Sequence, residues 1–180
     1  HARRSVMTPQ QFAAATGLPM SSGWFAPISS AQSEFQIVGP VRIAAWLAQV
    51  GHESGGFRFV REIWGPTPAQ MRYEGRKDLG NTQPGDGFRF RGRGLIQITG
   101  RTNYAQLERA FRLPLLTQPE LLEQPELAAR SAARFWAANG CNALADSGDF
   151  TALTRRINGG LNGLADRERR WTIAKRALAA

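Results

Sequence analysis

One stretch of the chain, residues 40–50, carries almost no polar residues and therefore has to be buried. After Pro40 it reads Val-Arg-Ile-Ala-Ala-Trp-Leu-Ala-Gln-Val, and Gly55 and Gly56 follow soon afterwards. Proline at the first helical position and glycine just beyond the last are typical of helix ends. A helix that is apolar on most sides belongs in a protein interior. The stretch predicts a central helix around which the rest of the chain packs.

Helix-boundary residues recur along the chain. Thr8, Pro9 and Gln11 form the pattern of a capped helix start, and Gly17 ends that helix. Residues 19–39, which are rich in Ser, Gly and Pro, predict a loop or a broken helix. Further helices are predicted at 102–111, near 118–123, at 125–139, at 149–157 and from Asp166 onwards.

Residues 54–100 differ from the helical parts because Gly and Pro are dense there. Apolar and basic residues alternate from Phe88 to Arg91, and this period of two predicts a short strand or β-ribbon. Long loops on a rigid helical scaffold are where functional sites usually lie. The sequence predicts a mostly α-helical single domain over residues 7–180, with one Gly-rich insertion. Residues 1–6 are interpreted as a remnant or an upstream extension.

Composition excludes several function classes. Apolar residues make up 42% of the 180 residues, yet no apolar run approaches the roughly 18–20 residues of a membrane-spanning helix. A single cysteine, Cys141, and two histidines exclude a disulfide framework and a zinc cluster. A net charge of +9 favours polyanionic partners such as nucleic acid, anionic lipid or an acidic cell-wall polymer, without choosing among them. No secretory signal is visible.

Glu53 stands at the end of the apolar helix, beside His52 and before Ser54. A carboxyl group there is partly desolvated and faces the negative end of the helix dipole, and both effects favour its protonated form. A general acid needs that form at neutral pH. The alternative is a solvated glutamate at a helix end. His52 lacks the second histidine of a His-Glu-x-x-His zinc motif, so we interpret it as a hydrogen-bonded structural residue.

Glu62 follows nine residues later, and Arg58 and Arg61 would hold it ionised, as a general base requires. Two carboxylates in different surroundings form the usual acid and base pair for cleaving a glycosidic bond. An ordinary ion pair between Glu62 and Arg61 is the alternative. Glu74 is the rival second carboxylate, although a surface pair with a neighbouring basic residue such as Arg76 explains it more simply.

Between Arg91 and Tyr104, glycines are mixed with polar residues. Glycines let the backbone approach a ligand closely, and Gln97, Thr99 and Asn103 offer amide and hydroxyl groups that suit sugar hydroxyls. Neither Gly-x-Gly-x-x-Gly nor Gly-x4-Gly-Lys-Ser/Thr occurs, so a nucleotide site is not predicted.

Four motifs, in this order along the chain, resemble those of family 19 glycoside hydrolases. They are Gly-His-Glu-Ser-Gly-Gly at 51–56, Glu62, Phe-Arg-Gly-Arg-Gly-Leu-Ile-Gln-Ile-Thr at 90–99, and Ile-Asn-Gly-Gly at 157–160. The most similar branch is that of phage and prophage endolysins, which share the catalytic domain of family 19 chitinases. The resemblance implies a lysozyme-like fold and an inverting hydrolase that uses no metal or cofactor.

The resemblance also implies roles for individual residues. Glu53 is implied as the general acid, Glu62 as the general base, and Thr99 as the residue that positions the attacking water. In an inverting enzyme the two carboxyl groups lie roughly 6.5–9.5 Å apart, which leaves room for that water.

Further residues match family positions around the substrate. Gln97, Asn103 and Asn158 match positions that contact sugar, and Arg167 matches a late arginine that helps to organise the second carboxylate. Asn158 also suits a helix C-cap. The run that begins at Ile63 and Trp64 departs from the Asn-Leu-Asn-Tyr-like run of many endolysins. Trp64 either offers an aromatic platform for a sugar face or is buried.

The sequence therefore predicts a monomeric endolysin that hydrolyses β-1,4 bonds between amino sugars of peptidoglycan. We expect it to be made in the host bacterial cytoplasm and to act on the wall after release. Its basic charge would attract it to the anionic envelope, and nucleic acid is not an expected partner. The alternatives are a chitinase, a lytic transglycosylase and a non-catalytic basic wall-binding domain.

The basic C-terminal helix from Asp166 carries Trp171, which we expect to dock on the core while the arginines face solvent. A membrane-permeabilising tail is the alternative.

Overall fold

The computed structural model describes residues 6–179, so most of the predicted N-terminal extension, residues 1–5, lies outside the described residues. The described chain is mostly helical. Its α-helices are α1 (Pro9–Thr16), α2 (Phe25–Glu34), α3 (Pro40–Glu53), α4 (Pro68–Met71), α5 (Asp86–Arg89), α6 (Arg101–Phe111), α7 (Pro125–Ala138), α8 (Cys141–Ser147), α9 (Phe150–Asn158) and α10 (Leu164–Leu178). Short 3-10 turns are η1 (Met20–Ser22), η2 (Lys77–Leu79) and η3 (Pro119–Glu123).

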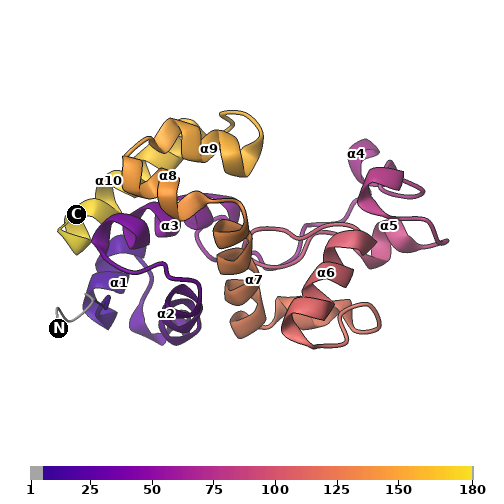
Figure 1. Ribbon diagram of the computed structural model, residues 1–180, viewed down its shortest axis with the longest axis horizontal. Coiled ribbons are helices and arrows are strands. Elements are labelled where there is room, and N and C mark those ends of the chain that lie inside the picture. Colours follow the sequence, from indigo (N-terminus) through magenta and orange to yellow (C-terminus); the bar gives the residue numbers. More distant parts are fainter. Residues whose placement is uncertain (1–5, 180) are drawn as a thin grey trace.

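The helices form two groups along the longest axis of the molecule. Helices α4, α5 and α6 lie at one end, α1, α2, α3, α8, α9 and α10 lie at the other, and α7 stands between them (Figure 1). Two apolar clusters match this division. The larger surrounds α3, whose Ala44, Trp46 and Val50 are fully buried, as the sequence predicted. The smaller consists of Phe90, Tyr104, Leu107, Phe111, Leu115 and Leu122.

Helix α10 belongs to the larger cluster. Ala174 and Leu178 are buried, and the Trp171 ring stacks on Phe150 with centroids 4.3 Å apart. The predicted docking of Trp171 is therefore confirmed, with the exception that Arg167 on the same helix is buried and does not face solvent. No helix in the described part of the chain is both long and apolar enough to cross a membrane.

Two predictions about local structure are wrong. Residues 25–34, expected in a loop or broken helix, form α2. Its Pro27 is the third residue of the helix, where a backbone N–H has no partner within the helix, so proline costs little there. Phe88 and Arg89, expected at the start of a β-ribbon, lie in the helical turn α5. Extended pairing among the described residues is limited to two isolated bridges, between Arg61 and Arg93 and between Arg93 and Ile98.

Candidate active site

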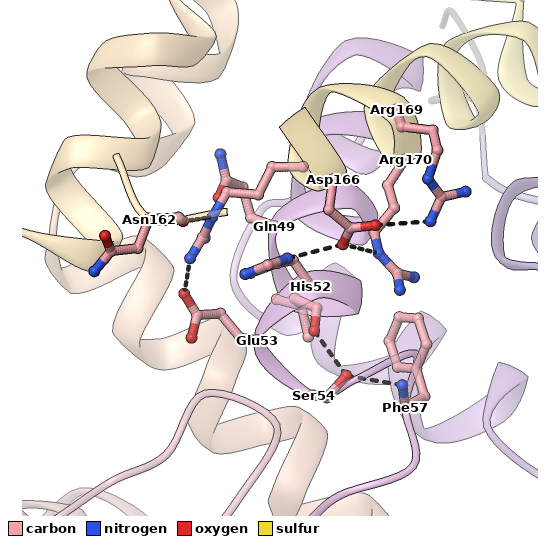
Figure 2. Close-up of polar contacts among 11 residues, drawn as sticks. Gln49, His52, Glu53, Ser54, Phe57, Asn162, Asp166, Arg169 and Arg170 are labelled. Atoms are coloured by element: carbon pink, nitrogen blue, oxygen red, sulfur yellow. Dashed lines mark hydrogen bonds and ion pairs between the residues drawn. The ribbon is translucent and has the colours of Figure 1, made fainter. Parts of the chain in front are cut away.

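Glu53 is the last residue of α3, and one of its carboxylate oxygens is fixed by a buried arginine. Its Oε1 accepts a hydrogen bond of 2.6 Å from Nη2 of Arg167, whose side chain is only 1% exposed. The same guanidinium donates to Oε1 of Gln49 at 2.7 Å and to the carbonyl oxygen of Asn162 at 3.0 Å (Figure 2). Each nitrogen of the Arg167 guanidinium thus has an acceptor, and Oε2 is the Glu53 oxygen that is not bonded to it.

The structure assigns Arg167 to a different carboxylate from the one that the family resemblance implied. It contacts Glu53, the first carboxylate, whereas the sequence placed it with Glu62. The reason is the packing of α10 on α3, which sets the first turn of α10 against the last turn of α3. A buried guanidinium needs hydrogen-bond acceptors, and Glu53 supplies one of them.

A second network joins the same two helix ends beside Glu53. Nδ1 of His52 lies 2.8 Å from Oδ2 of Asp166 (Figure 2). The same carboxylate accepts a hydrogen bond from Arg170 at Oδ2 and one from Arg169 at Oδ1, each of 2.8 Å. Burial alone would raise the pKa of Asp166, but the hydrogen bonds from Arg170, His52 and Arg169 hold it well below its usual range. The structural role predicted for His52 is confirmed.

Glu62 is held by neutral hydrogen-bond donors. Its Oε1 accepts from the backbone N–H of Gly92 at 2.6 Å, and its Oε2 accepts from Gln70 at 3.1 Å and from the Tyr73 hydroxyl at 3.3 Å. The alternative of an ion pair between Glu62 and Arg61 is wrong, because Arg61 bonds to Glu123 at 3.3 Å. That Arg58 and Arg61 keep Glu62 ionised stays a prediction. Three uncharged donors thus fix the orientation of the Glu62 carboxylate.

Gln70, which the sequence analysis missed, is the most heavily used of these partners. It is 6% exposed, and its Nε2 donates to Ile63 O at 2.8 Å as well as to Glu62. Its Oε1 accepts from the backbone N–H groups of Gly65 at 3.1 Å and Thr67 at 2.8 Å. Gln70 therefore fixes both the carboxylate and the loop that carries it.

Tyr73 was also missed. Burial and the neighbouring Glu62 carboxylate raise the pKa of Tyr73, so its hydroxyl remains a protonated donor. A sequence signal existed only for Gln70, which stands three residues after Thr67 in a capping-box pattern. That pattern predicts a local cap and says nothing about a contact with Glu62.

Gly92, in the glycine-rich segment that follows α5, lies against Glu62. The backbone of Glu62 donates to Gly92 O at 2.9 Å, and Gly94 donates to Val60 O at 2.8 Å, so the two segments run side by side. A Cβ atom at residue 92 would lie 2.9 Å from Oε1 and Cβ of Gln97. The glycine thus allows the Gln97 side chain to lie directly over the amide that bonds to Glu62.

Buried Arg93 holds the segment around Gly92 in place from the protein interior. It is 3% exposed, and it bonds to Glu123 at 2.9 Å, to Arg89 O at 2.7 Å and to the Tyr104 hydroxyl at 3.0 Å. Burial raises the pKa of Tyr104 to about 12, despite the nearby arginines, so the phenol stays neutral. Its hydroxyl in turn donates to Arg91 O at 2.5 Å.

The other predicted site residues lie in different parts of the structure. Asn158 ends α9, and its Oδ1 accepts from the backbone N–H of Asn162 at 3.2 Å, on the Glu53 side. Nδ2 of Asn103 donates to Thr99 O at 2.8 Å at the start of α6. Asn103 also lines a hollow of about 260 Å³ between α6 and α7. Thr99 is not among the hydrogen-bond partners of Glu62.

Trp64 lines an open cleft of about 610 Å³ together with Glu62 and Phe88. The Trp64 ring is half-buried, with its centroid 5.3 Å from that of Phe88 and 6.2 Å from that of Tyr73. The indole is therefore supported from two sides while still forming part of the cleft wall.

Glu74 is tied into the turn before α5. Its carboxylate accepts from the backbone N–H groups of Gly87 at 2.9 Å and Gly85 at 2.8 Å, which lower the pKa of Glu74. The predicted surface pair with Arg76 or Lys77 is wrong, since Arg76 bonds to Asp78 at 2.8 Å and, among the described residues, Lys77 forms no ion pair with Glu74. In residues 6–179, no group of three or more His, Cys, Asp or Glu side chains is placed to hold a metal ion.

No family model matches the chain, but comparison with individual relatives shows its family. A glycosyl hydrolase family 19 domain-containing protein of Haemophilus influenzae is 34% identical over 175 residues, which cover 81% of this chain and 84% of the relative. An endochitinase of Arabidopsis thaliana is 39% identical over 137 residues, or 74% of this chain and 46% of the plant protein. The chain thus spans about half the length of that plant relative.

Solved structures show the same fold. Chitinase C of Streptomyces griseus superposes with a TM-score of 0.77 at 24% identity, covering 97% of this chain and 77% of that one. A class IV chitinase of Zea mays gives a TM-score of 0.74 at 24% identity, covering 97% of this chain and 94% of that one. The helical fold is the lysozyme-like fold of a glycoside hydrolase, as predicted. The chain belongs to family 19 of the glycoside hydrolases.

Proposed function

We propose that this protein is an endolysin that hydrolyses β-1,4 bonds between the amino sugars of peptidoglycan, with inversion at the anomeric carbon. The observation that carries the proposal is the contrast between its two carboxylates. Glu53 has one oxygen bonded to a buried guanidinium, whereas Glu62 lies in a cleft and is held by neutral donors. Carboxylates in such different surroundings suit the separate roles of acid and base.

Glu53 acts as the general acid. With Oε1 bonded to Arg167, the transferable proton is carried on Oε2 and passes to the glycosidic oxygen of the leaving sugar. The guanidinium also stabilises the carboxylate that remains after the proton has left.

Glu62 acts as the general base and takes a proton from the water that attacks the opposite face of the ring. Gly92, Gln70 and Tyr73 hold its carboxylate in one orientation while that water is bound. Thr99 positions the water. Gln97, Asn103, Asn158 and Trp64 contact the sugars.

Charge supports peptidoglycan as the substrate. Peptidoglycan carries carboxylates on its peptide branches, whereas chitin is neutral, and a protein with a net charge of +9 attracts an acidic polymer. Chitin hydrolysis is the second candidate, because the plant relatives are named endochitinases and the matching structures are chitinases.

The test compares clearing of outer-membrane-permeabilised bacteria with hydrolysis of glycol chitin, using the wild type and Glu53→Gln. We expect clearing by the wild type and none by Glu53→Gln, which nearly preserves the side-chain shape. Glu168→Gln, the same change at an exposed site on α10, is the matched control and should clear normally.

Other outcomes point elsewhere. Clearing by a folded Glu53→Gln protein would end the acid role of this residue. Wild-type cleavage of glycol chitin without clearing would select the chitinase, and neither activity would select a binding domain.

A further inference from the structure

Three arginines line the cleft that contains Glu62. Arg58, Arg61 and Arg91 form its wall together with Glu62 and Glu123. Glu123 lies 3.3 Å from Arg61, but it is also bonded to buried Arg93, which lies outside the wall. In the part of the chain that the structure describes, neither Arg58 nor Arg91 forms an ion pair with an acidic residue. The wall therefore carries positive charge that the protein itself does not neutralise.

Aromatic rings hold two of these guanidinium groups in place. Arg91 lies 4.0 Å from the centroid of Phe88, and Arg58 lies 5.3 Å from that of Phe59. Nη1 of Arg91 also donates to Phe88 O at 2.9 Å. A guanidinium that lies over a ring keeps N–H groups along its edge for a ligand, and its side chain is already partly ordered.

The environment of Arg91 shows how crowded these cations are. Burial, together with the charges of Arg93 and Arg61, lowers the pKa of Arg91. The group remains charged at neutral pH, so an anion that entered the cleft would relieve this repulsion.

We propose that Arg58, Arg61 and Arg91 form a subsite that binds carboxylates of the lactyl-peptide branch of a peptidoglycan strand. This inference rests on the proposed function and adds to it the place where the acidic branch lies during cleavage. Guanidinium forks match the geometry of carboxylates, and because the subsite adjoins Glu62, a bound carboxylate would anchor the strand beside the base. Neutral chitin lacks this group, so the subsite would select peptidoglycan over chitin.

The experiment measures kcat/KM on two forms of the same soluble glycan strands. One form keeps its peptide carboxylates, and in the other they are amidated with carbodiimide and ammonia. The test variant is Arg58→Gln/Arg91→Gln. The matched control, Arg109→Gln/Arg176→Gln, removes the same charge from exposed positions on α6 and α10, away from the cleft. Thermal melting confirms that each variant is folded.

We expect the wild type to have a higher kcat/KM on the acidic strands than on the amidated ones. In the test variant the ratio of these two values should fall about tenfold, which corresponds to about 1.4 kcal/mol. The control should keep the wild-type ratio. Lysines at positions 58 and 91 (Arg58→Lys/Arg91→Lys) should restore the preference only in part, because they keep the charge and lose the fork.

The contrary outcomes separate the two proposals. A test variant that keeps the wild-type ratio overturns the subsite and leaves the hydrolase standing. If that variant instead loses binding to phosphatidylglycerol vesicles, the arginines serve a lipid surface and the subsite is likewise refuted. A wild type that cuts glycol chitin and neither form of strand overturns peptidoglycan as the substrate, and the subsite with it.

Discussion

Replacement of Gln70 by glutamate tests whether this residue controls the base. Gln70→Glu keeps the shape of the side chain and an acceptor for the N–H groups of Gly65 and Thr67. It replaces the amide donor that faces Glu62 Oε2 at 3.1 Å and Ile63 O at 2.8 Å with a second acceptor. The change therefore acts on hydrogen bonding and charge and hardly on packing.

The magnitude follows from these contacts. A hydrogen bond to a charged group contributes about 1.5–3 kcal/mol, and two adjacent carboxylates cannot both ionise freely. The pair then shares a proton, which neutralises the base over part of the working pH range. For a chain of this size, we expect the melting temperature to fall by about 3–12 °C. We expect kcat/KM at neutral pH to fall by about 10²-fold, the lower end of what general base catalysis contributes.

The assay is kcat/KM on soluble glycan strands as a function of pH, with melting curves recorded alongside. Because the base works only when ionised, a shared proton moves the acid limb of the profile to higher pH, so the loss should be larger at pH 5 than at pH 8. Gln10→Glu, at an exposed position in α1, is the matched control. An unshifted acid limb with a rate within threefold of wild type would refute the role of Gln70.

Three further predictions follow from the site and from α10. Glu62→Gln should lose ~10²–10⁴-fold in activity and also melt at a lower temperature, because its amide NH2 cannot accept a hydrogen bond that a carboxylate oxygen accepts. Glu74→Gln should keep its activity within a few-fold of wild type, and the reverse pattern of activity would identify Glu74 as the base. Because the folded protein lowers the pKa of Asp166, its carboxylate contributes stability above the unfolded pKa of about 3.9, and this stability is lost as the pH falls further. Asp166→Asn should therefore lower the melting temperature more at pH 7 than at pH 3. An equal difference in melting temperature between mutant and wild type at both pH values would contradict this. Deletion of residues 166–180 should unfold the protein, since it removes Trp171 and the buried residues of α10; unchanged melting with lost activity on intact Gram-negative cells would indicate a membrane-permeabilising tail.

The helices whose ends carry strong local signals were predictable. Thr8 caps α1 with Gln11 in a capping box, Pro40 opens α3, and Asp149 caps α9, each through contacts within one turn. The prediction failed at Pro27, where proline signals a break although it sits in the first turn of α2. It failed again near Phe88, where the alternation of Phe and Arg arises from a helical turn after Gly85 and not from a strand.

The sequence suggests two candidate carboxylates and does not predict which residues bond to them. Glu53 and Glu62 stand out because each has a distinctive neighbourhood in the sequence. The partner of Glu53, Arg167, comes from 114 residues later, and only the packing of α10 on α3 decides which carboxylate it meets. The partners of Glu62 depend on how the loops around Gln70 and Gly92 fold against each other, and no local pattern encodes that.

The anomeric form of the first product tests the two-carboxylate mechanism most directly. Proton NMR during early hydrolysis of soluble peptidoglycan strands should show new reducing ends in the α configuration, before mutarotation mixes the anomers, and no 1,6-anhydro sugar. Reducing ends that first form in the β configuration would contradict inversion by Glu53 and Glu62. An anhydro product would show that no water is activated at all and that the protein is a lytic transglycosylase.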